Sequence, residues 1–181
     1  MTTPRLLTKY WKEVTPAMRA KFGYKSIMAV PKIIKVTLNV GLSRAAKEPK
    51  FTERVEADLA KISGQKPARR KAKKSISGFK TRRGMPVGMM VTLRGRRMYD
   101  FIDRLISIAL PRSRDFRGLD LKTFDKRGNL SIGVREHSIF PEVIYESLKD
   151  IFSLEVTVTT NAQAAKEGIE LLRLMGFPIK V

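Results

Sequence analysis

The residues best suited to do chemistry in this sequence are the cations between Leu59 and Tyr99. This range contains thirteen Lys and Arg residues and no Asp or Glu. Within it, the segment KKSISGFKTRRGMPVG, residues 73–88, combines five cations with three glycines. Cations without neighbouring carboxylates attract phosphate groups, and glycines permit backbone angles that other residues avoid. The segment therefore predicts contact with a polyanion.

The spacing of the glycines argues against nucleotide hydrolysis. A P-loop requires the pattern GxxxxGK[ST] between a strand and a helix. Five residues separate Gly78 from Gly84, no Lys follows Gly84, and the next segment reads as a strand. We expect residues 75–87 to form a projecting hairpin tip or loop bounded by strands, with its cations available to RNA.

Carboxylates and histidine give little support for an enzyme. Asp103, Asp115, Asp120 and Asp125 could form a two-metal nuclease site, but three of them alternate with cations in RDFRGLDLKTFDKRG, which favours ion pairs and turns. His137 is the only histidine and the chain has no cysteine, so a metal site or catalytic triad is disfavoured. We expect His137 at the surface or at a strand end, and we predict no catalytic residue, metal, cofactor or small-molecule substrate.

The composition indicates one globular domain with an unusual charge. The 181 residues are 43% hydrophobic, which suits a single domain over residues 1–181. The formal net charge is +20, so nucleic acid is the first expected partner and an anionic membrane the second. No apolar run approaches the roughly 20 residues that span a bilayer, so we expect no membrane partner.

Helices are predicted where caps, prolines and an apolar period of 3.6 coincide. Thr3-Pro4 starts an N-terminal helical segment over residues 1–24, and Thr15-Pro16 predicts a kink or a new helix inside it. Three further helices are expected at 51–63, stopped by Gly64; at 96–110, ended by Pro111; and from about Asn161 to Gly176.

Four segments alternate between apolar and polar residues and are predicted strands: 34–40, 87–93, 130–135 and 154–159. Clean alternation is typical of an antiparallel sheet with one covered face. We therefore predict a two-layer α+β fold, a mostly antiparallel β-sheet with helices packed on one face and the other face open. The open positions carry mainly donors and small residues, with Glu155 the one anion, and such a face can lie against RNA.

RNA is favoured over DNA by what the sequence lacks. It has no zinc ligands and no basic region followed by heptads, and the open strand positions carry no aromatic residue. Recognition of the backbone, the 2′-hydroxyls and the shape of RNA fits better than base stacking. Phe79 could stack on a base or anchor the hairpin. The alternative function is a non-specific RNA chaperone or nucleic-acid-compacting protein.

Several long motifs, in order along almost the whole chain, resemble the bacterial form of large-subunit ribosomal protein number five, the L-five family. They are VPKIIKVTLNVG, ISGQKPARRKAKKSISGFKTRRGMPVGMMVTLRGRRMYDF, PRSRDFRG, FDKRGNLSIGVRE, FPE and GFP. The resemblance implies a cytoplasmic protein that binds 5S rRNA and large-subunit rRNA in the central protuberance. It also implies contacts with P-site tRNA, with small-subunit ribosomal protein thirteen and with other 5S-associated ribosomal proteins.

By position, the resemblance implies 5S rRNA contacts at Asn39, Gln65, Phe79 and Thr92. The predicted set adds nearby cations and donors: Lys35, Thr37, Lys66, Arg69, Lys71, Ser75 and Arg94. The tRNA-contacting loop is Lys80, Thr81, Arg82, Arg83, Gly84, Met85 and Pro86. The bridge to the small subunit is Pro111, Arg112, Ser113, Arg114, Asp115, Phe116, Arg117 and Gly118.

Overall fold

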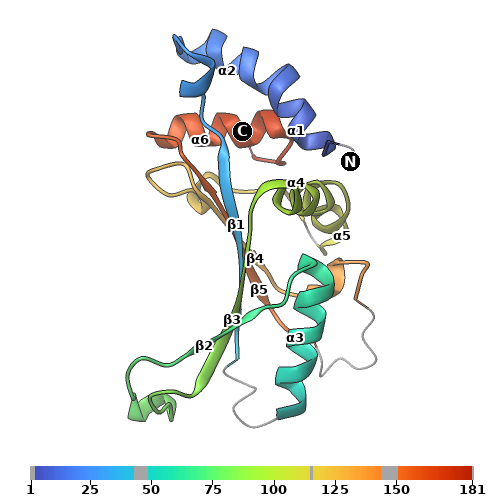
Figure 1. The fold of residues 1–181 in the computed structure, drawn as a ribbon, viewed down its shortest axis with the longest axis vertical. Coiled ribbons are helices and arrows are strands. Elements are labelled where there is room, and N and C mark those ends of the chain that lie inside the picture. Colours follow the sequence, from blue (N-terminus) through green and yellow to red (C-terminus); the bar gives the residue numbers. More distant parts are fainter. Residues whose placement is uncertain (1–2, 43–48, 115, 144–150, 181) are drawn as a thin grey trace. The chain divides into compact units, whose positions relative to one another are not determined.

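The computed structural model describes residues 3–42, 49–114, 116–143 and 151–180, and it has the predicted α+β fold. Within these residues, five strands form an antiparallel sheet in the order β2-β3-β1-β5-β4 (Figure 1). They are β1 Ile33–Gly41, β2 Ala68–Lys71, β3 Pro86–Leu93, β4 Leu130–Val134 and β5 Leu154–Thr160. The residues group into two compact units, unit 1 with Met1–Val36, Leu93–Ile132 and Thr157–Val181, and unit 2 with Thr37–Thr92 and Gly133–Val156.

The predicted alternation is present in the strands. In β1, Val36, Leu38 and Val40 have no exposed surface, whereas the intervening Asn39 is exposed. The same pattern holds in β3, where Met89, Val91 and Leu93 are buried and Thr92 is partly exposed. Strands with a period of two bury one row of side chains and leave the other nearer to solvent.

Strand β2 is not among the four strands predicted from the alternation of apolar and polar residues. Its residues, ARRK, are all exposed and carry no apolar alternation. It pairs antiparallel with β3, Ala68 opposite Met90, with a bulge between Arg70 and Lys71. Strand β2 lies at the edge of the sheet, where cationic side chains discourage pairing with a second chain. Because its residues are cationic and exposed, they show no alternation of apolar residues.

Two long helical segments of unit 1 pass through a proline by widening one turn. The first comprises α1 Arg5–Lys9, a π turn Tyr10–Val14 and α2 Thr15–Phe22; the second comprises α4 Gly95–Arg104, a π turn Leu105–Ala109 and α5 Leu110–Arg112. The residue before each proline donates its N–H to the carbonyl five residues earlier, Thr15 to Tyr10 and Leu110 to Leu105. The wider turn relieves the clash that a proline ring makes in an α-helix. The expected end at Pro111 is therefore wrong, since the helix continues to Arg112.

The final helix, α6 Ala165–Met175, begins four residues later than predicted from Asn161. The side chain of Asn161 instead accepts a hydrogen bond from the Lys32 N–H at 2.6 Å, and its own N–H donates to the Lys32 carbonyl. Asn161 is thus tied to the start of β1. Gly176 ends α6 in the left-handed conformation, as predicted.

In unit 2, the core lies beneath α3, Pro49–Ser63, whose Val55, Leu59 and Ile62 have no exposed surface. The short 3-10 helix His137–Ile139 also belongs to this core. The expected surface position of His137 is wrong. Its ring is fully buried and stacks on Phe152 with centroids 4.0 Å apart, and its Nδ1 accepts the Phe152 N–H at 3.3 Å.

A turn before β4 is built on Asp125. Its carboxylate accepts hydrogen bonds from the N–H groups of Arg127 and Asn129 and from the Asn129 side chain. Asn129 in turn accepts the Thr160 N–H at 2.9 Å, so the turn is joined to β5. Burial raises the pKa of Asp125, but the hydrogen bonds outweigh it and hold the pKa below the ordinary value.

The Asp125 turn predicts a loss of stability in acid. A lowered folded-state pKa means that the carboxylate stabilises the fold above its unfolded value of about 4, and that this contribution disappears as pH falls through the folded value. Thermal midpoints of the wild type and Asp125→Asn should differ at pH 7 and converge as the pH falls from about 4 through the lowered folded-state pKa. A difference that stays constant down to about pH 2 would contradict the assignment.

Candidate nucleic-acid interface

The uncovered row of β1 and β3 holds four of the predicted RNA-binding residues. Asn39 is exposed, and Lys35, Thr37 and Thr92 are partly exposed. These side chains alternate with the buried apolar row, so their exposure follows directly from the strand period. They offer amide, hydroxyl and ammonium donors, and none is an anion.

Gln65 lies beside Thr92. Its Nε2 donates to the Thr92 carbonyl oxygen at 3.4 Å, and its backbone N–H donates to the Ser63 hydroxyl at 3.2 Å. Gly64, with φ of 66°, makes the turn that brings Gln65 to β3 after the end of α3. The structure therefore brings together two predicted residues that are 27 positions apart in the sequence.

The remaining predicted cations near the strands differ in how freely they can bind phosphate. Lys66 and Lys71 are exposed, and Arg94 is exposed directly before α4. Arg69 instead donates from Nε and Nη2 to the Glu56 carboxylate, at 3.0 and 2.6 Å. Since one side of its guanidinium already binds a carboxylate, Arg69 is a weaker phosphate ligand than its sequence position indicates.

The basic loop between β2 and β3 is internally hydrogen-bonded. Ile76 pairs with Thr81, the Ser75 hydroxyl accepts the Arg83 N–H at 3.0 Å, and the Gly84 N–H donates to the Ala72 carbonyl. Between them lies a 3-10 turn, Ser77–Phe79, followed by Lys80 in the left-handed conformation. The loop thus carries a defined set of turns in unit 2.

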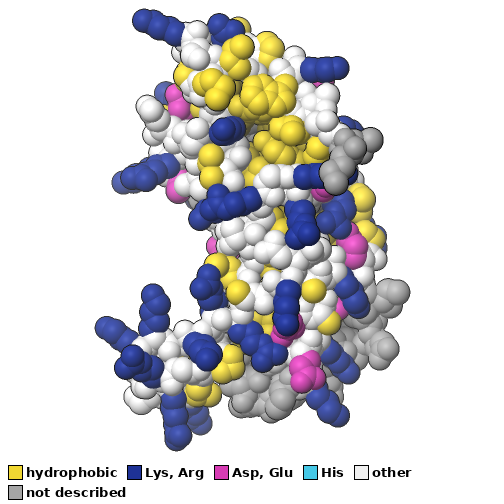
Figure 2. Space-filling view, in the orientation of Figure 1, with side chains coloured by type: hydrophobic (Ala, Val, Ile, Leu, Met, Phe, Trp, Pro, Cys, Tyr) yellow, Lys and Arg dark blue, Asp and Glu magenta, His cyan; other side chains and the backbone are white. Residues whose placement is uncertain are grey.

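The surface of this loop is cationic with an apolar tip. Figure 2 shows Lys and Arg side chains around the β2–β3 end of unit 2. Lys80, Arg82, Arg83 and Ser75 are exposed, while Thr81 and Met85 are partly covered. Phe79 is 78% exposed, so the hairpin-anchoring interpretation is wrong and its ring is available for stacking.

The residues that directly follow the predicted bridge segment form hydrogen bonds with the last residues that the structure describes. Arg112, Arg114 and Arg117 are exposed, and Asp115 lies outside the described residues. Leu119, which follows the segment, donates its N–H to the Pro178 carbonyl and accepts from the Lys180 N–H. The Lys180 ammonium also donates to Asp120 at 2.8 Å, and this hydrogen bond and charge lower the pKa of Asp120.

Three of the four carboxylates considered for a metal site lie in the described part of the chain, and each has a different partner there; Asp115 lies outside it. Asp103 binds Arg5, Asp120 binds Lys180, and Asp125 holds its own turn. In the part of the chain that the structure describes, no group of three His, Asp or Glu side chains could hold a metal ion. Among the same residues, no helix has the length and hydropathy to cross a membrane.

The chain is similar to known proteins over nearly its whole length, including the strands and most of the basic loop. Residues 26–82 match a family model described as ribosomal protein L5, and residues 86–179 match the model of the C-terminus of the same ribosomal family. Large ribosomal subunit protein uL5 of Carboxydothermus hydrogenoformans is 51% identical over 97% of this chain and 98% of its own length. The uL5 protein of Chloroflexus aggregans is 49% identical over 98% of this chain and 99% of its own.

Proposed function

The chain belongs to the ribosomal protein L5 family, and from this premise we propose that the uncovered residues of β1 and β3 bind 5S rRNA. Its relatives are proteins of the large ribosomal subunit, so this chain is a structural ribosomal protein of the cytoplasm and not an enzyme.

The exposure of Asn39 carries this proposal. Asn39 lies between the buried Leu38 and Val40, yet its side chain presents both a donor and an acceptor to solvent. Thr37 on β1 and Thr92 on β3 are further short polar side chains at open positions, which allows a close approach of sugar and phosphate groups. Shape and 2′-hydroxyl recognition of folded RNA needs such a surface.

The double variant Asn39→Ala/Thr92→Ala tests the sheet-face model. Each lost hydrogen bond is worth about 1 kcal/mol, so binding of 5S rRNA should weaken by roughly tenfold or more. Thermal unfolding should be unchanged, because neither side chain is in the buried row. The binding is measured by titration at fixed salt, with Ser153→Ala/Gln163→Ala as the control variant, because both polar side chains are exposed and lie outside the strands.

Two outcomes decide this model. Unchanged 5S affinity in the Asn39→Ala/Thr92→Ala variant would remove the sheet face from the interface. The wild type should also prefer 5S rRNA to a length-matched control RNA at moderate salt; equal affinities would support the alternative of a non-specific RNA chaperone. The affinity itself should fall steeply between about 50 and 200 mM salt, by about 10³-fold or more if six or more phosphates are contacted.

The basic loop and the bridge segment bind partners other than 5S rRNA. The loop from Lys80 to Pro86, with its exposed cations and fixed turns, contacts P-site tRNA. The segment from Pro111 to Gly118 faces small-subunit ribosomal protein thirteen, and its exposed Arg112, Arg114 and Arg117 are available for that contact. In both cases, cations that lie outside the sheet face are available to a second partner.

A further inference from the structure

Unit 1 contains a groove that none of these roles uses. It has a volume of about 680 Å³ and lies between the first helical segment, the second half of α4 with its π turn, and the end of α6. Its apolar surface includes Ile106 and its polar surface includes Ser107. The three cations at its rim, Arg5, Lys9 and Lys12, all come from the first helical segment.

The spacing of these cations places them on one side of the helix. Residues four and three positions apart, such as 5, 9 and 12, lie on the same helical face. Residues 1–36 contain eight Lys and Arg and one carboxylate, Glu13, which also lines the groove. Within the described residues, neither Lys9 nor Lys12 forms an ion pair, so both ammonium groups are available to an anion.

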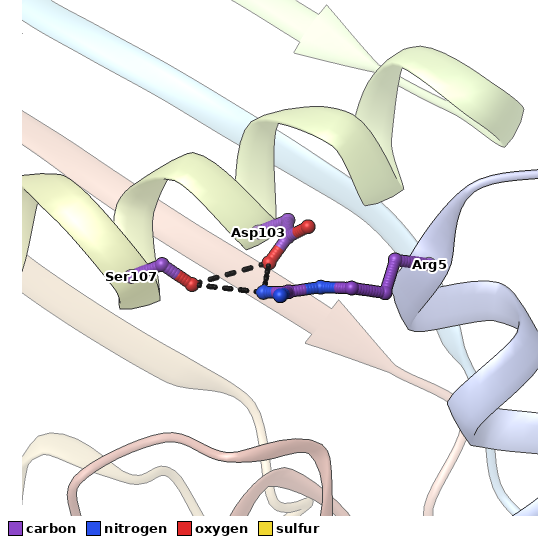
Figure 3. A network of polar contacts seen from close by, with 3 residues as sticks. All are labelled: Arg5, Asp103 and Ser107. Carbon is purple, nitrogen blue, oxygen red and sulfur yellow. Dashed lines mark hydrogen bonds and ion pairs between the residues drawn. The ribbon is translucent and has the colours of Figure 1, made fainter.

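The guanidinium of Arg5 is held in position at this rim, as Figure 3 shows. Its Nη2 donates to Asp103 at 2.6 Å and to the Ser107 hydroxyl at 3.2 Å, and Ser107 also bonds to Asp103. These contacts neutralise Asp103, which would otherwise repel an anion. No hydrogen bond within the described residues uses Nε or Nη1 of Arg5, so these donors are free to bind a ligand.

We propose that this groove binds an unpaired nucleotide of ribosomal RNA, with its phosphate between Lys9 and Lys12 and its base against Ile106. The inference rests on the proposed function, because it assumes a ribosomal RNA partner. A volume of about 680 Å³ accommodates a nucleotide, and unpaired bases are the parts of RNA that side chains read individually. A rim of cations above an apolar wall matches the two ends of such a ligand.

The first test compares two double variants of the full-length chain that remove the same charge. Lys9→Gln/Lys12→Gln changes the groove, and Lys126→Gln/Lys166→Gln changes exposed cations elsewhere in unit 1. Binding to purified 5S rRNA and to purified large-subunit rRNA is measured separately from about 50 to 200 mM salt. With one of the two RNAs, the groove variant should bind about tenfold more weakly and the salt slope should fall by about 2, while the control stays within about twofold of wild type.

Equal effects of the two variants would overturn the groove proposal, because charge alone would explain them. This failure is distinct from failure of the proposed function, in which the wild type itself shows no preference for 5S rRNA over the control RNA. Thermal unfolding of both variants confirms that the comparison is between folded chains.

The second test identifies the occupant of the groove directly. A photoreactive benzoylphenylalanine is introduced at Ser107, which lines the groove, or at Ile108, which is exposed but does not line it. After irradiation of ribosomes assembled in cells, the residue at 107 should crosslink to one rRNA position and the residue at 108 should not. Crosslinking of residue 107 to a ribosomal protein, or to no macromolecule, would overturn the proposal.

Discussion

Replacing Gly168 with Ala is expected to destabilise the chain by about 3 kcal/mol and to lower its thermal midpoint by roughly 10 °C. Gly168 lies in α6, where its backbone touches the turn that Asp125 organises. A Cβ on Gly168 would collide with the backbone of Gly128, and a Cβ on Gly128 would lie 2.7 Å from the Gly168 Cα. Backbone cannot rotate away as a side chain can, so either α6 or the turn must move.

The expected loss is a net value. Ala favours a helix over Gly by about 1 kcal/mol, so the collision must exceed this gain for the variant to be less stable. Gly133→Ala is a matched control, because Gly133 has no positive φ and no atom within 4 Å of an added Cβ. Midpoints of both variants are measured by circular dichroism. A Gly168→Ala variant as stable as the wild type would show that the two backbones are not in contact.

This contact also marks a limit of sequence reasoning. The period of two around Leu38 and Val91 predicts which strand residues are buried, because alternation has a direct physical cause. A glycine inside the helical pattern of α6 reads only as a weak helix former. Its partner, Gly128, lies 40 residues earlier, and nothing local in the sequence records that the two backbones meet.

Long-range partners account for other differences. Arg69 reads as a free cation, yet Glu56 binds it from α3. His137 stands between charged and polar residues in the sequence, but Phe152 and the core of unit 2 enclose it. The groove cations Arg5, Lys9 and Lys12 could have been found from their helical spacing. The apolar and hydroxyl side chains opposite them, Ile106 and Ser107, come from a helix about 100 residues later.

Reversing the charge of the basic loop is expected to abolish its contact with tRNA and leave binding of 5S rRNA largely intact. Arg82→Glu/Arg83→Glu removes two phosphate contacts and adds two like charges, which should weaken tRNA-dependent binding by roughly 100-fold at low salt. Both side chains are exposed, and the hydrogen bonds that hold the loop use the Arg82 and Arg83 N–H groups instead of their guanidinium groups. The turns of the loop should therefore survive the change.

Lys73→Glu/Lys74→Glu supplies the control for this loop, since these exposed cations lie in the same segment but before the predicted tRNA-contacting residues. Binding of tRNA to the P site is measured with ribosomes that carry each variant, and 5S rRNA binding is measured with the isolated chains. If the loop contacts tRNA through its tip, only the Arg82/Arg83 variant should lose P-site binding. A comparable loss of 5S rRNA binding in that variant would instead make the loop part of the primary RNA interface, because the charge change would then act on the same ligand as Asn39 and Thr92.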